Sequence, residues 1–537
     1  MAPVPSSNGV VTATTKPEAD AVRRFITRLR DKITGVIAGF DRIVFRGSLL
    51  PLCHAAGMKD FLDHQDVLMK DFEPFAQSIT HMLRAAADDT GAKLHEKVEL
   101  IKSPTISKEM VARNFLADRP IRQGPICVLS AVEPCWTWEV HRSRSRETPQ
   151  QFQRKSGKCL HHYHYFLDRR FGFMHVRVQT WFPFQVRVCM NGREWLGRRL
   201  DEHRLRYRRA DNCFQWIASP ARAQELMDHM LRLPWPNVLD ELAVAANPVL
   251  ATLMEQLGHR FYWTTWQSEW ATDVMFKDTE SLDACYPTFL RYAMTNFKSP
   301  DVMRFLGRKL VGQYRGEVTT HFKLRVEGTR IKHAAKGNSI KMYNKQGNVL
   351  RVEQTTTDPN EFKVVRRAHG DPQSERCPRP LRKGVVDIKR LAAVGKASNS
   401  RYLDALASVV VETPLQSIVD PLTSPAEIGG RRVRGLRPWA GPDVALMEAV
   451  SRGEFLINGF RSRDLLPLLF PGLSNEPNER RRASGKLTRL LRLLRAHGLI
   501  ERVLGSYRYL VTTPGRTAIA AILAARSASL SKLEQCA

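Results

Sequence analysis

The chain has 537 residues, of which 43% are apolar, so it is long enough for several domains and apolar enough to bury their cores. Its 83 Lys and Arg exceed its 54 Asp and Glu, which leaves a net charge of +29. Repulsion among so many positive charges destabilises a compact fold, and binding to a polyanion would relieve it. The 10 Trp and 24 Phe are too many for a disordered basic tail, which excludes a histone-tail type of protein.

The cysteines and the N-terminal sequence indicate the compartment. The nine cysteines are scattered and contain no C-x-x-C pair, so we expect buried or unreactive thiols in a reducing environment. The start of the chain lacks the basic and apolar segments of a secretory signal, and no later stretch has about 18 uninterrupted apolar residues. The expected location is the cytoplasm, and nucleic acid is a better partner than a membrane surface.

The first third of the chain predicts a mixture of helices and strands. Apolar residues at helical spacing predict an amphipathic helix over 21–40, followed by a short strand at 41–47. A mostly helical stretch runs to about Asp118, and the continuous apolar run at 124–132 is typical of a buried strand. Residues 136–157 are rich in Arg, Ser and Gln without periodicity, which predicts a solvated loop between strands.

The middle of the chain predicts an antiparallel sheet backed by helices. Asn191-Gly192 is a tight-turn dipeptide, residues 219–258 have a helical pattern, and 339–353 predicts a second hairpin that turns at Gln346-Gly347-Asn348. We find no internal sequence repeat. The three strand-like runs that precede the turn dipeptide are 159–167, 173–180 and 184–190.

The C-terminal region predicts three helices, a β-hairpin and a last helix. The third helix is closed by Gly498, the hairpin turns around Gly505-Ser506, and Thr513-Pro514 begins the last helix. Helix, helix, helix and hairpin is the order of a winged helix. The predicted elements are helices at 443–450, 462–469 and 478–497 and strands at 499–503 and 507–512.

The third helix of this region is apolar on one side and basic on the others. Leu487, Leu490, Leu491 and Leu494 form the apolar stripe. Between positions 431 and 526 there are eighteen Lys and Arg against seven Asp and Glu, and such side chains bind phosphates and release counterions. The candidate DNA-binding residues are Arg480, Arg481, Arg482, Lys486, Arg489 and Arg492 on the helix and Arg508 in the hairpin.

The pattern RASGKLTRLLRLLRAHGLIERVLGSYRYLVTTPGR resembles the recognition helix and wing of MarR-like winged-helix regulators. The resemblance covers about a sixth of the chain and implies duplex DNA as ligand, with the third helix in the major groove. MarR-like regulators are small dimers, whereas more than four hundred residues precede this module. The alternative interpretation is a winged helix that serves protein contacts only.

A second pattern lies in the predicted sheet. His162-Tyr163-His164 followed by apolar residues resembles the strand signature of HUH endonucleases, in which two histidines on one strand face bind a divalent metal. That family pairs them with a third polar ligand, for which Glu139, Glu269 and Glu353 are candidates, and we favour Glu353. The alternative interpretation is an ordinary sheet in which both histidines are hydrogen bonded.

The same family uses a tyrosine that attacks the DNA phosphate and becomes covalently linked to it. The candidates here are Tyr343 and Tyr207; the hairpin around Tyr343 looks like the tyrosine-lysine hairpin of some rolling-circle replication initiators, although its spacing differs. Mg²⁺ or Mn²⁺ would be needed for such nicking, and no cofactor is needed for DNA binding alone. The sequence contains no Gly-rich phosphate loop, zinc-finger pattern or Gly-x-Ser-x-Gly elbow.

Taken together, these patterns predict an α+β fold with a mixed helical and antiparallel-sheet body and a C-terminal winged helix-turn-helix domain. The expected function is DNA binding in transcription regulation or mobile-element biology; the alternative is a metal-dependent HUH-type nicking enzyme. The sequence leaves open the target site, the choice between DNA and RNA, and the oligomeric state. The expected divisions are a disordered tail at 1–20, an α/β region at 21–135, a central α+β body at 136–368, a linker and helical connector at 369–441 and the winged-helix DNA-binding domain at 442–537.

Overall fold

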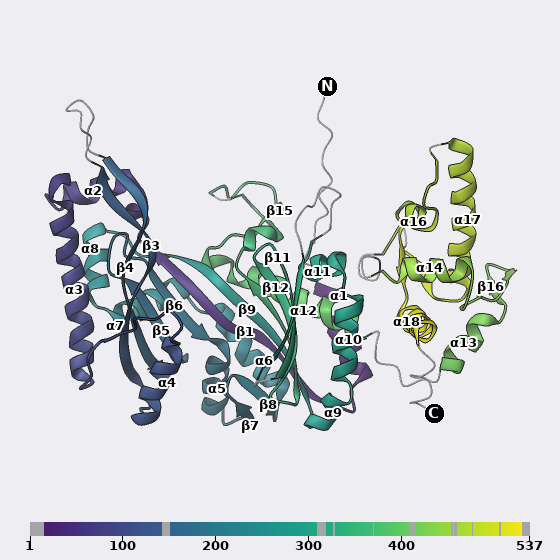
Figure 1. Ribbon diagram of the computed structural model, residues 1–537, viewed down its shortest axis with the longest axis horizontal. Helices are drawn as coiled ribbons and strands as arrows, with labels where there is room; N and C mark the ends of the chain where they lie inside the picture. The colour runs from purple at the N-terminus through teal and green to yellow at the C-terminus, as the bar shows by residue number, and fades with distance from the viewer. Residues whose placement is uncertain are drawn as a thin grey trace.

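The computed structural model contains a mixed α and β body and a C-terminal module, shown in yellow and yellow-green in Figure 1. The predicted combination of helices with a large antiparallel sheet is confirmed. The structure describes residues 15–141, 151–308, 318–325, 328–368, 370–407, 415–452, 455, 459–474, 476–503 and 506–528.

An eleven-stranded sheet runs through the body. Its strands are β1 (Ile33–Ser48), β2 (Glu99–Leu100), β3 (Gly124–His141), β4 (Gln151–Asp168), β5 (Gly172–Gln179), β6 (Val186–Asn191), β9 (Tyr262–Phe276), β10 (Thr319–Arg325), β11 (Gly328–Ala335), β12 (Asn338–Lys345) and β13 (Val349–Thr356). Their order is β10-β11-β12-β13-β9-β1-β6-β5-β4-β3-β2. Only the edge pair β2 and β3 is parallel. The sheet therefore joins the two predicted regions 21–135 and 136–368 in one structure.

The sheet consists of two halves with the same strand order. In the first half, β1 is followed by helices and then by the meander β3-β4-β5-β6, whose last strand pairs with β1. In the second half, β9 is followed by helices and by the meander β10-β11-β12-β13, whose last strand pairs with β9. The two initial strands pair with each other at the centre. This repeat of topology was not detected as a repeat of sequence.

The central strand β1 replaces the second half of the helix predicted over 21–40. Helix α1 (Thr15–Arg28) ends before this segment, and the chain is extended from Ile33 onward. The residues of the segment include β-branched side chains and two glycines, which weaken a helix. Pairing with β9 along its whole length satisfies the backbone groups of β1, so tertiary contacts decide its conformation.

Two other predictions from the first half are wrong for local reasons. Most of the loop predicted over 136–157 is the outer part of a hairpin formed by β3 and β4, while 142–150 lie outside the described residues. Asn191-Gly192 does not turn between two strands. The Asn191 side chain instead caps helix α5 (Gly192–Glu202), because its oxygen accepts a hydrogen bond of 2.7 Å from the backbone N–H of Arg193.

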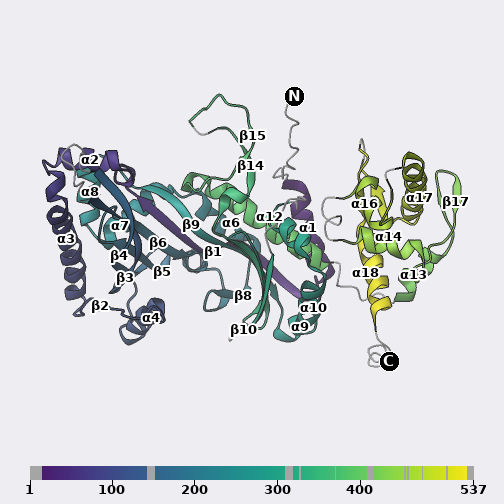
Figure 2. The ribbon, with the colours of Figure 1, turned by 45° about the horizontal axis from the view of Figure 1, so that its top comes forward.

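Helices cover both faces of the sheet, as Figures 1 and 2 show. Near the first half they are α2 (Ala55–His64), α3 (Phe72–Lys93), α4 (Lys108–Asp118), α6 (Pro220–His229), α7 (Trp235–Ala246) and α8 (Val249–Leu257). Near the second half they are α9 (Thr279–Asp283), α10 (Tyr286–Asn296), α11 (Ser299–Phe305) and α12 (Ile388–Ala407). Two small hairpins are added by β7 (Tyr207–Ala210) with β8 (Cys213–Ile217) and by β14 (Lys363–Arg366) with β15 (Cys377–Pro380).

Helix α12 lies in the predicted linker 369–441 but packs in the body core. It contacts β9 and β13, and Gly395 allows the close approach because a Cβ at this position would lie 2.6 Å from the Cβ of Trp270. The buried Asn399 amide donates to the carbonyl oxygens of Trp270 and Val352, each at 2.9 Å. The helical part of the predicted linker and helical connector therefore belongs to the core of the body.

The C-terminal module has a hydrophobic core of its own, separate from the core of the body. Its elements are α13 (Leu415–Thr423), β16 (Ala426–Ile428), β17 (Arg431–Val433), α14 (Pro442–Val450), α16 (Ser462–Leu469), α17 (Pro477–Ala496), β18 (Ile500–Arg502), β19 (Tyr509–Val511) and α18 (Thr513–Ser527). Two polar contacts join it to the body: Arg516 pairs with Asp404 at 2.9 Å, and Arg28 donates to Thr517 at 2.8 Å.

A buried network of four charged residues lies where the two halves of the sheet meet. Arg351 on β13 pairs with Asp273 on β9 at 2.8 Å and with Asp41 on β1 at 3.0 Å. Arg193 on α5 pairs with Asp273 at 2.9 Å. All four side chains are buried, and the two guanidinium groups balance the two carboxylates. Burial alone would raise the pKa of Asp273, but Arg193 and Arg351 hold it below its usual value.

We expect Arg351→Met to lower the free energy of unfolding by about 3 to 5 kcal/mol, because it leaves buried carboxylates without their cation. Lys59→Met breaks the exposed pair with Asp63 and serves as the control, with a much smaller expected loss because solvent screens this pair. Denaturant unfolding of both variants measures the difference. Equal losses in the two variants would contradict the central role of the network.

Candidate functional site

The third long helix of the C-terminal module, α17, separates apolar and basic side chains. Leu487, Leu491 and Leu494 are buried in the core of the module, while Leu490 is partly buried. Arg480, Arg481, Arg482, Lys486 and Arg489 are exposed, and Arg492 is half-buried. Within the part of the chain that the structure describes, Arg481, Arg482 and Lys486 have no ion-pair partner. These charges are therefore available to a ligand.

A second basic element, not predicted from the sequence, lies beside α17. The hairpin of β16 and β17 turns at Gly429-Gly430, where both glycines have positive φ, and it exposes Arg431 and Arg432. The Gly-Gly dipeptide was the signal that identifies this hairpin, because such turns require positive φ. Together with Lys486, Arg489 and Arg492 of α17, the two arginines line a hollow of about 750 Å³.

An ion pair fixes this hairpin to the rest of the module. Arg434, just after β17, makes a two-pronged contact with Asp443 of α14, with nitrogen-to-oxygen distances of 2.7 and 2.8 Å. Burial opposes ionisation of Asp443, but the hydrogen bonds from Arg434 and Arg437 hold its pKa below its usual value. The hairpin is therefore held at a defined place relative to α17.

The hairpin of β18 and β19 lies on the other side of α17 and carries both aromatic and basic side chains. Tyr507 is 81% exposed, and the guanidinium of Arg502 lies 5.4 Å from the centroid of its ring. Arg508, a predicted DNA contact, is half-buried and donates to the carbonyl of Gly459 at 3.4 Å. Phe460 forms an isolated β-bridge with Tyr509 at the edge of this hairpin.

The predicted metal ligands His162 and His164 lie in the body core. Each is 3% exposed, and none of their four ring nitrogens has a hydrogen-bond partner. Their neighbours across the strands include Val176 and Val178 of the main hydrophobic cluster. The expectation that both histidines share one strand face holds, but that face is covered.

The other predicted catalytic residues lie away from the two histidines. Four strands separate β4, which carries His162, from β13, which carries Glu353, so at about 4.8 Å per strand they are roughly 20 Å or more apart. Tyr207 donates to Asp201 at 2.9 Å, and Glu139 pairs with Lys155 at 2.8 Å. The histidines, a carboxylate and a tyrosine therefore do not converge on one metal site.

The structure does bring Tyr343, Glu353 and Glu269 together. The Tyr343 hydroxyl donates to Glu353 at 3.2 Å, and Lys341 pairs with the other oxygen of Glu353 at 2.5 Å. Asp41, Glu269 and Glu353 each place a carboxylate oxygen within 4.8 Å of the others. We call these five residues the carboxylate cluster. Glu353 is fully buried and Tyr343 is 4% exposed.

The charges of the carboxylate cluster influence one another. Burial and the neighbouring Glu353 raise the pKa of Glu269 to about 7. Burial opposes the charge of Lys341, but Glu353 and Glu269 outweigh it and raise the lysine pKa. The three carboxylates could hold a divalent cation, and the lysine supplies a built-in positive charge in their midst. A second group of potential metal ligands is Cys135, Cys159 and His161.

The comparisons with known proteins identify no relative. No family model, no curated protein and no solved structure matches the chain. In the described part of the chain, no helix combines the length and the apolar character needed to cross a lipid bilayer. The functional interpretation therefore depends on the side chains themselves.

We expect the two buried histidines to make the fold sensitive to acid. Burial lowers the pKa of His162 to about 4 and that of His164 to about 3, against an ordinary value of 6.5. As the pH falls below 6.5, these histidines become protonated in the unfolded chain but stay neutral in the folded chain. The free energy of unfolding therefore decreases between pH 6.5 and about 4. Each histidine contributes at most about 1.4 kcal/mol per pH unit in this range.

Denaturant unfolding of a His162→Phe/His164→Phe double variant across this pH range measures the effect. The free energy of unfolding of the variant should depend less steeply on pH than that of the unsubstituted protein. His259→Gln, which changes an exposed histidine, should leave the slope unchanged. An identical slope in the double variant would show that the pair does not couple to folding.

Proposed function

We propose that the protein binds duplex DNA through its C-terminal module, which we interpret as a winged helix. The order α14, α16, α17, β18, β19 and α18 is that of the fold, and an isolated bridge joins Phe460 to Tyr509 of the hairpin. In this interpretation α17 enters the major groove and the hairpin of β18 and β19 lies along the backbone. The cytoplasmic roles that fit are transcription regulation and mobile-element biology.

The observation that carries the proposal is the exposed basic surface of α17. Its cations lie on the faces opposite the leucine stripe, so they can contact phosphates without disturbing the core of the module. Arg431 and Arg432 extend the basic surface on the side of the β16-β17 hairpin. Arginine can also donate two hydrogen bonds to the edge of guanine, which gives α17 a means of reading sequence.

We expect the triple variant Arg482→Glu/Lys486→Glu/Arg489→Glu to weaken duplex binding by on the order of 100-fold at moderate salt, because three phosphate contacts become repulsive. The logarithm of the binding constant should also fall less steeply with the logarithm of salt, by roughly three units of slope. Fluorescence anisotropy with labelled duplexes at several salt concentrations measures both quantities on the full chain.

The matched control reverses the same number of positive charges at other positions. Lys93, Lys97 and Arg122 are exposed at the far end of the body, so Lys93→Glu/Lys97→Glu/Arg122→Glu should bind DNA nearly as well as the unsubstituted protein. Equal loss in both triple variants would indicate binding through net charge alone. Unchanged affinity of the α17 variant would show that α17 is not part of the DNA interface. Stronger binding to RNA than to DNA of the same length would show that RNA is the ligand.

A second candidate function is DNA nicking in the body, and one observation favours it. Tyr343, a predicted nucleophile, donates to Glu353 beside two further carboxylates that could hold Mg²⁺ or Mn²⁺. In this candidate Asp41, Glu269 and Glu353 take the place that the histidines were expected to occupy. The burial of the Tyr343 hydroxyl means that a DNA strand would have to displace its neighbours to reach it.

Incubation of the purified protein with supercoiled and single-stranded DNA plus Mg²⁺ or Mn²⁺ tests this candidate. If Tyr343 is the nucleophile, denaturing gels should show nicks and a covalent protein-DNA adduct that disappears in Tyr343→Phe. Tyr207→Phe should retain the adduct, because Tyr207 is bonded to Asp201. The absence of any nick or adduct with either metal leaves DNA binding as the function.

A further inference from the structure

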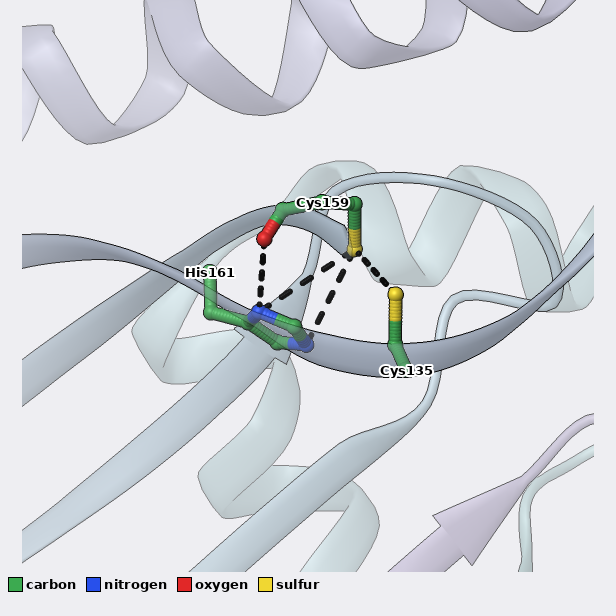
Figure 3. Close-up of side chains that lie close together, drawn as sticks. All are labelled: Cys135, Cys159 and His161. Atoms are coloured by element: carbon green, nitrogen blue, oxygen red, sulfur yellow. Dashed lines mark hydrogen bonds between the residues drawn. The ribbon is translucent and has the colours of Figure 1, made fainter. Parts of the chain in front are cut away.

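Three side chains with soft metal-binding atoms meet on adjacent strands of the β3-β4 hairpin, as Figure 3 shows. The Sγ atoms of Cys135 on β3 and Cys159 on β4 lie 3.0 Å apart. The ring nitrogens of His161 lie 3.9 and 4.0 Å from the Sγ of Cys159. All three ligand atoms fall within 4.8 Å of one another. The group is outside the carboxylate cluster and the C-terminal module.

The strand register explains why these residues meet. Cys135 is opposite Gly157, and Cys159 is opposite Glu133, so the two cysteines are diagonal neighbours on one face of the hairpin. His161 is two residues from Cys159 and therefore on the same face. The cysteines come from segments 24 residues apart in sequence, which is why no metal-binding spacing is visible along the chain.

The tautomer of His161 suits metal binding. Its Nδ1 lies 3.1 Å from the carbonyl oxygen of Cys159, and because a carbonyl only accepts, Nδ1 carries the hydrogen. Nε2 then has a free lone pair, and it lies 3.9 Å from the Cys159 sulfur. A backbone carbonyl that fixes one ring nitrogen is the usual arrangement around a histidine that binds metal through the other.

The geometry points to a Zn²⁺ site, and we propose that Cys135, Cys159 and His161 bind one Zn²⁺ ion. Tetrahedral zinc with bonds of about 2.3 Å to sulfur and 2.0 Å to nitrogen separates two sulfurs by roughly 3.8 Å and sulfur from nitrogen by roughly 3.5 Å. To reach these separations the two sulfurs, now 3.0 Å apart, move slightly apart, and the Cys159 sulfur moves slightly closer to the His161 Nε2, now 3.9 Å away. Two thiolates neutralise the dication, and thiolate with imidazole is a ligand set that Zn²⁺ prefers over Mg²⁺.

One of the three ligands, Cys159, borders a cavity, while His161 is buried. Cys159 lines a cavity of about 440 Å³ together with Thr137, Gly157, Thr180 and Trp181. Gly157, opposite Cys135, has no side chain to fill the space beside the sulfurs. A water molecule or a ligand can therefore complete the tetrahedron, as in zinc sites that keep one exchangeable position.

A disulfide is the competing use of the two cysteines, and the register disfavours it. Diagonal residues on neighbouring strands have Cα atoms about 7 to 8 Å apart, whereas disulfides need about 4.4 to 6.8 Å. A disulfide would also leave the lone pair on Nε2 of His161 without a metal to bind. The cross-link is therefore an outcome that the experiment must distinguish from metal binding.

The test uses the full chain, reduced and freed of metal with a chelator, and titrated with Co²⁺ as a spectroscopic substitute for Zn²⁺. We expect a sulfur-to-cobalt charge-transfer band and the visible bands of tetrahedral Co²⁺, saturating at one ion per chain and abolished by added Zn²⁺. Competition against a chromophoric chelator then gives the Zn²⁺ affinity. The absence of these bands in the reduced, folded protein overturns the proposal.

Variants identify the ligands. Cys135→Ser, Cys159→Ser and His161→Gln should each lower Zn²⁺ affinity by on the order of 100-fold or more, whereas Cys53→Ser and Cys285→Ser, which change cysteines outside the group, should not. Circular dichroism checks that each variant is folded, and the spectrum of the unsubstituted protein decides the question if one is not. Bands that persist in Cys159→Ser, or a Cys135-Cys159 cross-linked peptide whose reduction yields no metal uptake, also overturn the proposal.

Discussion

The ion pairs of Arg351 with Asp41 and Asp273 join the two halves of the protein. One guanidinium contacts carboxylates from β1 and β9, the strands that begin the two halves, and Arg193 of α5 adds a second cation. The register of β1 against β9 shifts between Phe40 and Arg42, at the position of Asp41. Such bulges re-aim a side chain, here toward the buried arginines. Charges this deep are tolerated only as a complete, mutually paired set.

The repeated strand order explains how one chain forms so wide a sheet. Each half begins with a long strand, adds helices, and closes with a four-stranded meander that returns to the long strand. The long strands are then internal to the sheet, so their backbone groups are satisfied on both sides. The halves differ in what they carry: the first bears the β3-β4 hairpin with its cysteines, and the second is covered by α12. The carboxylate cluster takes Asp41 from the first half and its other four residues from the second.

The C-terminal module forms a separate structural unit beside the sheet of the body. It has its own core and meets the body through α18, where Arg516 pairs with Asp404 and Thr517 accepts from Arg28. These contacts involve α18 and leave the basic faces of α17 exposed. Within the module, the ion pair of Arg434 with Asp443 fixes the β16-β17 hairpin, so Arg431 and Arg432 lie beside α17.

Local sequence patterns predicted the C-terminal module closely, and they predicted the body only in part. The leucine stripe of α17 and the glycine that follows the helix act within a few positions of one another, so local sequence patterns predicted α14, α16, α17 and the hairpin that follows. The spacing of His162 and His164 likewise placed both on one strand face. Whether that face is open to a metal or buried in a core depends on residues far away in sequence. In the folded protein both histidines of β4 are buried. The same reason holds for Ile33–Ser48, which became a strand because β9 pairs with it, and for Cys135 and Cys159, which only the register of β3 and β4 brings together.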